Sequence, residues 1–137
     1  MEENRREEGL IVTNQRNMFC SLNLDEQENK VKLYNATEQC DVLLNDIVGQ
    51  TIEIKDIYIE EYETIDKDTG EIKNKFRTIL FGSDGKTYAS GAYGIYNSLR
   101  KIFTIFGDPT QWETLKLMIY KRKTKTGTQT LCLKVEV

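Results

Sequence analysis

Residues 90–109 read SGAYGIYNSLRKIFTIFGDP and predict a well-marked helix. The apolar residues of this stretch follow one another at intervals of three and four, which places them on one stripe of an α-helix. They are Ala92, Ile95, Tyr96, Leu99, Ile102, Phe103 and Phe106. Ser90 suits the N-cap, Gly107 suits a left-handed C-cap, and Pro109 prevents continuation. Because such a stripe has to be buried, we expect the helix to pack against the segments on either side of it.

Residues 51–62 predict one long strand with a break in its alternation. The isoleucines before residues 55–56 occupy one parity, and those after them occupy the other. In a strand of period two, this reversal indicates a bulge that turns the second half of the strand towards another layer. The polar segment 64–74 should then form the loop of a long hairpin.

Four shorter segments complete the predicted sheet. Asp84-Gly85 marks a tight turn between two of them, and the polar tip KTKTGT separates the last two. The four strands are expected at residues 76–82, 86–89, 115–120 and 130–135. The resulting order is long bent strand, strand, strand, helix, strand, strand. This is the order of the oligonucleotide/oligosaccharide-binding (OB) fold, a mainly β, five-stranded Greek-key barrel with one helix between strands three and four.

The N-terminal part of the chain is less regular. Residues 1–17 are mostly charged, and we expect a flexible arm there. Short apolar alternations at residues 18–24 and 30–34 predict a hairpin, and residues 41–44 predict a short helical turn. No repeat or linker divides the remainder. The predicted organisation is therefore an arm at residues 1–17 and a single barrel domain with an N-terminal extension at residues 18–137.

Composition argues against catalysis. Among the 137 residues there is no histidine, so the commonest general base is missing, and phosphate-loop and nucleophile-elbow signatures are missing too. The carboxylates of residues 53–63 leave a magnesium-dependent nuclease as a further alternative, but no second carboxylate cluster accompanies them. The DxDxG sequence at residues 66–70 lacks the closing glutamate of a calcium loop. We expect a protein that is not an enzyme and that needs no cofactor or metal.

The three cysteines are widely spaced and are expected to be buried free thiols. The sequence has no apolar run long enough for a membrane helix and no signal-peptide pattern at its start, so we expect a cytoplasmic protein without a membrane partner.

Charge is unevenly distributed along the chain. The formal net charge is −3, yet residues 114–137 carry six basic groups and one acidic group. Aromatic residues are interleaved with cations both there and on the first three strands. Single-stranded nucleic acid needs this combination, because cations neutralise phosphates and flat rings stack on bases. The candidate contacts are Tyr58, Tyr62, Phe76, Arg77, Lys86, Tyr88, Tyr93, Tyr120, Lys121, Arg122, Lys123 and Lys125.

Four blocks of the sequence carry a resemblance. They are LNDIVGQTIEIKDI from residue 44, DGKTYAS from residue 84, GIYNSLRKIFTIFGDPT from residue 94 and the closing LCLKV. With these blocks the chain resembles a family of bacteriophage single-stranded DNA-binding proteins, over roughly residues 35–137. The resemblance implies an OB barrel that coats single strands during phage replication, recombination or repair, without catalysis.

Two hypotheses about partners follow. The first is sequence-tolerant binding of single-stranded DNA by a homo-oligomer or cooperative array that also contacts replication or recombination proteins. The alternative is a protein-interaction barrel, such as a replisome adaptor or an inhibitor of a host factor, whose contact surface would be the acidic N-terminal portion.

Overall fold

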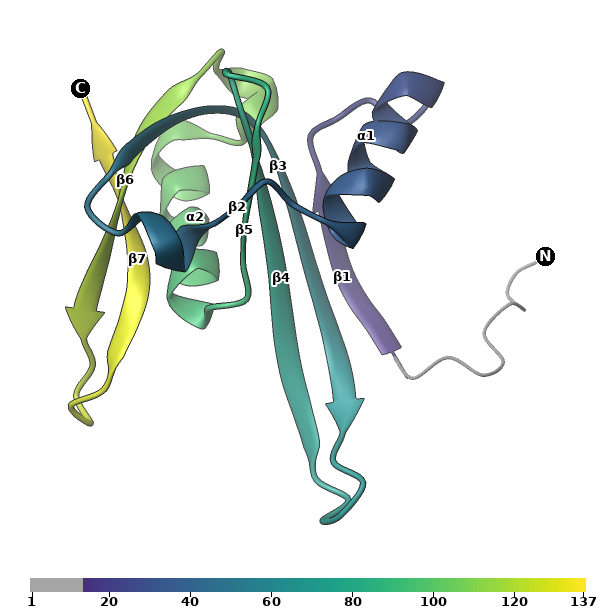
Figure 1. The fold of residues 1–137 in the computed structure, drawn as a ribbon, viewed down its shortest axis with the longest axis vertical. Helices are drawn as coiled ribbons and strands as arrows, with labels where there is room; N and C mark the ends of the chain where they lie inside the picture. Colours follow the sequence, from purple (N-terminus) through teal and green to yellow (C-terminus); the bar gives the residue numbers. More distant parts are fainter. Residues whose placement is uncertain (1–13) are drawn as a thin grey trace.

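The computed structural model describes residues 14–137 (Figure 1). Seven strands, two α-helices and two short 3-10 helices make up this part of the chain. In chain order they are β1 (Asn14–Cys20), α1 (Gln27–Glu38), β2 (Val42–Leu43), η2 (Leu44–Ile47), β3 (Thr51–Ile65), β4 (Ile72–Gly82), β5 (Thr87–Ser90), α2 (Tyr93–Phe106), η3 (Pro109–Gln111), β6 (Leu115–Lys123) and β7 (Gln129–Glu136). Neither α-helix of these residues is long and apolar enough to cross a membrane.

The long strand β3 is the centre of a curled, half-barrel sheet. The strand order is β2-β5-β4-β3-β6-β7, and β1 pairs with β3 as well. The first part of β3 pairs with β6, whereas its second part pairs with β4 on one side and β1 on the other. The register between β3 and β4 shifts between Ile54 and Asp56, which confirms the bulge expected at residues 55–56. This break lets one strand serve both halves of the sheet.

The mainly β class and the succession β3-β4-β5-α2-β6-β7 agree with the predicted OB-like order. The expected five-stranded barrel is wrong in its strand count and its closure, because β1 and β2 join the sheet and β5 does not pair with β7. Instead, β5 pairs in parallel with β2, and α2 lies along the edge of β7. There the backbone N–H of Leu133 donates to Ser98 Oγ at 3.1 Å, so the helix satisfies an edge group that a neighbouring strand would otherwise satisfy.

Helix α2 begins two residues later than the sequence indicated. Ser90 ends β5, and Ala92 is the N-cap, so the N-cap expected at Ser90 is wrong; the Ser90 hydroxyl accepts from the Ala92 N–H at 3.0 Å instead. Gly107 ends the helix with φ +87°, and its N–H donates to the Phe103 carbonyl. Pro109 then begins η3.

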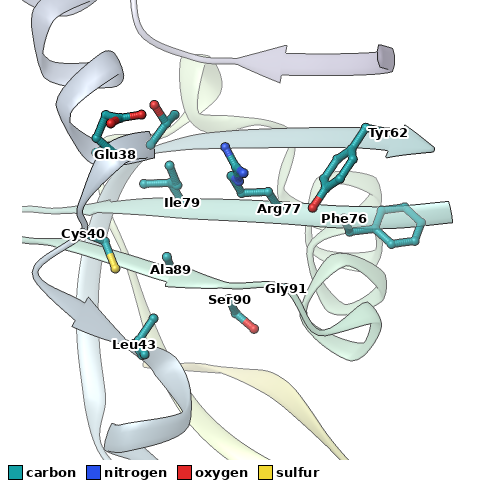
Figure 2. Close-up of a pocket in the computed structure, with 12 residues that line it drawn as sticks. Glu38, Cys40, Leu43, Tyr62, Phe76, Arg77, Ile79, Ala89, Ser90 and Gly91 are labelled. Atoms are coloured by element: carbon teal, nitrogen blue, oxygen red, sulfur yellow. The ribbon is translucent and has the colours of Figure 1, made fainter. Parts of the chain in front are cut away.

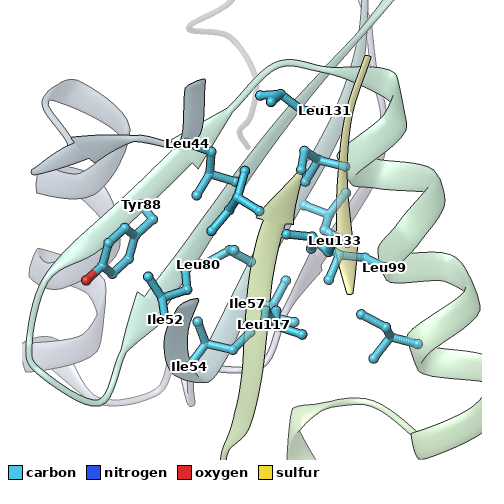
Figure 3. Packing of buried hydrophobic residues seen from close by; sticks show 14 residues of the cluster. Leu44, Ile52, Ile54, Ile57, Leu80, Tyr88, Leu99, Leu117, Leu131 and Leu133 are labelled. Carbon is cyan, nitrogen blue, oxygen red and sulfur yellow. The ribbon is translucent and has the colours of Figure 1, made fainter. Parts of the chain in front are cut away.

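The main core fills the space between the sheet and α2 (Figure 3). Its side chains come from η2, β3, β4, β5, β6, β7 and α2, and the fully enclosed ones include Ile57, Leu80, Leu99 and Leu117. The predicted apolar stripe of α2 contributes Ile95, Leu99 and Ile102 to this core. At the C-terminal end of α2, however, Phe106 remains 45 % exposed.

The second strand of the N-terminal hairpin, expected at residues 30–34, is wrong because these residues belong to α1. Leu33 and Ala36 lie one helical turn apart and pack on the outer face of the sheet, where they cover Tyr58. The turn expected at residues 41–44 is also corrected. Residues 42 and 43 form β2, and the 3-10 helix begins only at Leu44.

The predicted arm falls partly within the described residues. Residues 14–17 form the first part of β1 and pair with β3. Residues 1–13 lie outside the described residues.

Candidate nucleic-acid interface

Two hairpins point towards the same end of the molecule, with the N-terminus of α2 between them (Figure 1). One is formed by β3 and β4 and the other by β6 and β7. The first turn of α2 touches both. Its Tyr93 and Tyr96 rings lie against Phe76 of β4, and its Gly94 lies against Thr130 and the carbonyl of residue 131 in β7. The two hairpins and the helix end therefore border one continuous surface.

Three aromatic side chains form a ring cluster on this surface, made of Phe76, Tyr93 and Tyr96. The Phe76 and Tyr96 rings are stacked, with centroids 4.3 Å apart and an interplanar angle of 25°. Tyr93 meets Phe76 edge-on at 5.4 Å and lies 5.9 Å from Tyr96. Because Tyr93 is 56 % exposed, the cluster holds this ring in place from one side and leaves the remainder free for a stacking partner.

Arg77 lies on the opposite face of the β3–β4 hairpin from Phe76, since neighbouring residues of a strand alternate between faces. Its guanidinium carbon is 5.9 Å from the centre of the Tyr62 ring, and its Nη1 is 3.6 Å from Oε1 of Glu60. Both contacts come from β3: Glu60 lies directly opposite Arg77, and Tyr62 lies two residues further along the strand, opposite Lys75. They hold a cation and a ring together at the place where the sequence predicted a nucleic-acid contact.

The β6–β7 hairpin carries the basic cluster, defined as Lys121, Arg122, Lys123 and Lys125. All four side chains are exposed, and no acidic residue lies between them. Below the cluster, Lys134 Nζ is 5.0 Å from the centre of the half-buried Tyr120 ring. Four cations within five residues make this tip the most positive stretch of the printed sequence after residue 113. Such a cluster attracts phosphates by direct neutralisation and counterion release.

Three of the predicted contacts belong neither to the ring cluster, nor to the Tyr62–Arg77 pair, nor to the basic cluster. Tyr58 is 5 % exposed beneath α1, and burial, reinforced by the carboxylate of Glu60, raises the pKa of Tyr58 to about 12. Tyr88 is 6 % exposed; burial and its hydrogen bond to Asp84 raise its pKa to about 12. Lys86 is exposed, but it follows the β4–β5 turn at the other end of the molecule. Rings buried in this way offer no face to a base.

Sequence reasoning also missed Tyr96 and Asn97 as neighbours of the site. Tyr96, assigned to the helix core, is only partly buried and supports the ring cluster. Asn97 and Lys101 border a shallow groove of about 170 Å³ between α2 and the β6–β7 hairpin, together with Tyr120 and Arg122. Tyr93, Asn97 and Lys101 are spaced by four residues, so their shared helix face was a readable signal.

A cavity of about 290 Å³ lies between the end of α1 and the outer face of β3, β4 and β5 (Figure 2). Tyr62, Phe76 and Arg77 line it from the sheet, and Cys40 and Leu43 line it from the segment after α1. The sequence carried no signal for this cavity, because α1 was not predicted.

The carboxylates do not assemble a metal site within residues 14–137, where Cys, Asp and Glu side chains nowhere gather in threes around a potential ion position. At residues 66–70 the Asp66 side chain accepts from the backbone N–H groups of Asp68 and Thr69, which is the hydrogen bonding of an Asx turn.

Comparison with known proteins adds one match. A family model described as "Phage Single-stranded DNA-binding protein" matches residues 12–136. The match covers nearly the whole chain, includes every residue of the surface described above, and begins well before residue 35, where the resemblance seen in the sequence began. Searches of curated proteins and of solved structures found no match.

Proposed function

The chain belongs to the phage single-stranded DNA-binding protein family, and we propose that it coats single strands with little sequence preference during phage DNA replication, recombination or repair. The proposed role is non-catalytic and is exercised in the cytoplasm of the host cell. Bases stack on exposed rings, and lysine and arginine side chains neutralise the phosphates.

The observation that carries this proposal is the placement of Tyr93. Its exposed ring is held by Phe76 and Tyr96 between two hairpins, one of which ends in the basic cluster. A strand that crosses the end of α2 can stack a base on Tyr93 while its phosphates reach the β6–β7 hairpin. The residues that we assign to DNA contact are Tyr62, Phe76, Arg77, Tyr93, Tyr120, Lys121, Arg122, Lys123 and Lys125.

The test is the salt dependence of binding to a labelled oligo-dT. Each phosphate contact on a single strand contributes about 0.7 to the slope of log K against log salt. In a variant with Lys121→Gln, Arg122→Gln and Lys123→Gln, the slope of log K against log salt should therefore be shallower by about 2. Because the unaltered protein has the steeper slope, the ratio of its affinity to that of the variant should fall by roughly 20-fold between 50 and 200 mM salt.

The matched control changes Lys30→Gln, Lys32→Gln and Lys55→Gln. These lysines are also exposed, and two of them lie on α1, away from the hairpin tips. The control removes the same charge from the protein, so it should retain the slope. Binding that is absent even at low salt, or that has no salt slope, would refute the proposal.

Oligomer formation and contacts with replication or recombination proteins remain predictions. The protein-interaction alternative makes the opposite forecast for the same titration, namely no measurable affinity for oligo-dT at any salt concentration.

A further inference from the structure

The cavity under α1 has the lining of a small-molecule site. Its walls are mainly apolar, with Ala36 from α1, Ile79 from β4 and Ala89 from β5. Tyr62 and Arg77 form one end of it, and in Figure 2 both side chains project from the same side of the strands. Its volume of about 290 Å³ is near the lower end of the range for ligand pockets, about 300 Å³. The space suits a single flat, partly polar group.

The cavity adjoins the surface proposed for DNA. Strand β5 ends at Ser90, which pairs with Thr78 of β4, so Phe76 lies two residues past the last β4 residue that pairs with β5. Phe76 and Ser90 both line the cavity. Phe76 also belongs to the ring cluster. A nucleic-acid strand stacked on Tyr93 is thus separated from the cavity only by the edge of the sheet at Phe76 and Gly91.

The charges at the cavity favour a base over a phosphate. Arg77 is its one cation, and Glu60 already lies 3.6 Å from that guanidinium. Glu38 lines the opposite end. A phosphate inside would face two carboxylates and one shared cation, which is repulsive on balance. A neutral base meets apolar walls, the Tyr62 ring and the N–H groups of Arg77, which hydrogen-bond to base edges.

We infer that this cavity is a subsite that receives one nucleobase of the bound strand, with Tyr62 and Arg77 as its base contacts. The inference rests on the proposed function, because the base arrives as part of a bound single strand. The end of helix α1 and the segment at Cys40 line the subsite on the side away from the sheet, and we expect the subsite to accept a base turned out of the strand.

Cys40 provides a reporter at the cavity wall. The unaltered protein is treated with N-ethylmaleimide, and the alkylation rates at Cys40 and Cys20 are followed separately by peptide mass spectrometry. Both cysteines are free and half-buried, but only Cys40 lines the cavity, so Cys20 serves as the internal reference. Oligo-dT is added at about ten times its Kd, which leaves about one protein molecule in eleven unbound. We expect alkylation of Cys40 to slow roughly tenfold and that of Cys20 to stay unchanged.

An abasic oligonucleotide of the same length separates the base from the backbone. Brought to the same occupancy, as measured by anisotropy, it should leave the Cys40 rate unchanged. Equal protection by both oligonucleotides, no protection by bound oligo-dT, or equal slowing at Cys20 would each overturn the subsite while leaving DNA binding intact. An absence of any binding would instead overturn the proposed function and the subsite together.

Discussion

Substituting Gly94 tests the contact on which the open edge of the half-barrel depends. A Cβ atom at this position would lie 2.1 Å from the carbonyl oxygen of Leu131 and 2.6 Å from Oγ1 of Thr130. Cβ atoms are essentially never found within 3.0 Å of a heavy atom that lies outside their own and the adjacent residues, and the Leu131 oxygen belongs to the backbone of a paired strand. In Gly94→Ala, the first turn of α2 must therefore move away from β7 by about 0.9 Å.

Three contributions determine how Gly94→Ala should change the free energy of unfolding. In an isolated helix the change from glycine to alanine stabilises by about 1 kcal/mol. Overpacking of a well-filled contact costs about 1 to 3 kcal/mol. When the whole helix shifts with its first turn, the 3.1 Å hydrogen bond from the Leu133 N–H to Ser98 Oγ lengthens beyond bonding range, at a further cost of about 1 kcal/mol. We expect the free energy of unfolding to fall by about 1 to 3 kcal/mol, opposite in sign to the helix propensity.

Thermal unfolding followed by circular dichroism measures this effect. For a domain of this size, the loss lowers Tm by roughly 3 to 15 °C. Gly91→Ala is the matched control, because its φ is not positive and its Cβ would meet only the Phe76 oxygen, at 3.4 Å. Should Gly94→Ala equal or exceed the stability of the unaltered protein, or Gly91→Ala lose as much, the close contact between α2 and β7 would not hold the edge as described.

Two further predictions concern single side chains. Tyr93→Ala should weaken oligo-dT binding by roughly 5-fold to 150-fold with an unchanged salt slope, because a stacked base contributes about 1 to 3 kcal/mol; Tyr34→Ala, at a ring 62 % exposed on α1, should have no effect. The Tyr88 hydroxyl donates to Asp84 Oδ2 at 2.7 Å and lowers the pKa of that carboxyl. Ionised Asp84 therefore stabilises the fold above its ordinary pKa, and this contribution is lost as the pH falls through the lowered pKa. In Tyr88→Phe the pKa of Asp84 should rise towards its ordinary value in an NMR titration; an unchanged pKa would rule out the hydrogen bond as its cause.

The sequence predicted the elements whose signals are local. The α2 stripe repeats over several turns and ends at Gly107, and the parity change at residues 55–56 reports the bulge directly. The tight turn at Asp84-Gly85 is marked by glycine, which adopts φ +87° there. Each of these features depends on residues close together in the chain, so periodicity and turn chemistry are sufficient to locate them.

Helix α1 and the failure to close the barrel had no such signal. Within α1 only Ala36 is buried, and Val31 and Tyr34 remain exposed, so its apolar residues do not form a helical stripe. The position of this helix depends on its contacts with the sheet, which join residues far apart in the sequence. Helix α1 also explains the burial of Tyr58. Because Tyr58 alternates with the isoleucines on either side, its ring lies on the face of the sheet away from the main core, and α1 buries it there.

The charges of the two hairpins indicate different roles in binding. Near its tip, the β3–β4 hairpin carries Glu60, Glu61 and Glu63 on one strand, and on the facing strand two lysines and Arg77. With the turn included, residues 60–77 carry six acidic and four basic groups, a net charge of −2, so this hairpin gains little from phosphates, whereas its rings remain suited to bases. The tip of β6–β7 carries cations only. A protein of net charge −3 can thus bind the phosphates of a polyanion through the β6–β7 hairpin and stack its bases on the β3–β4 hairpin. Salt should weaken the phosphate contacts far more than the base contacts.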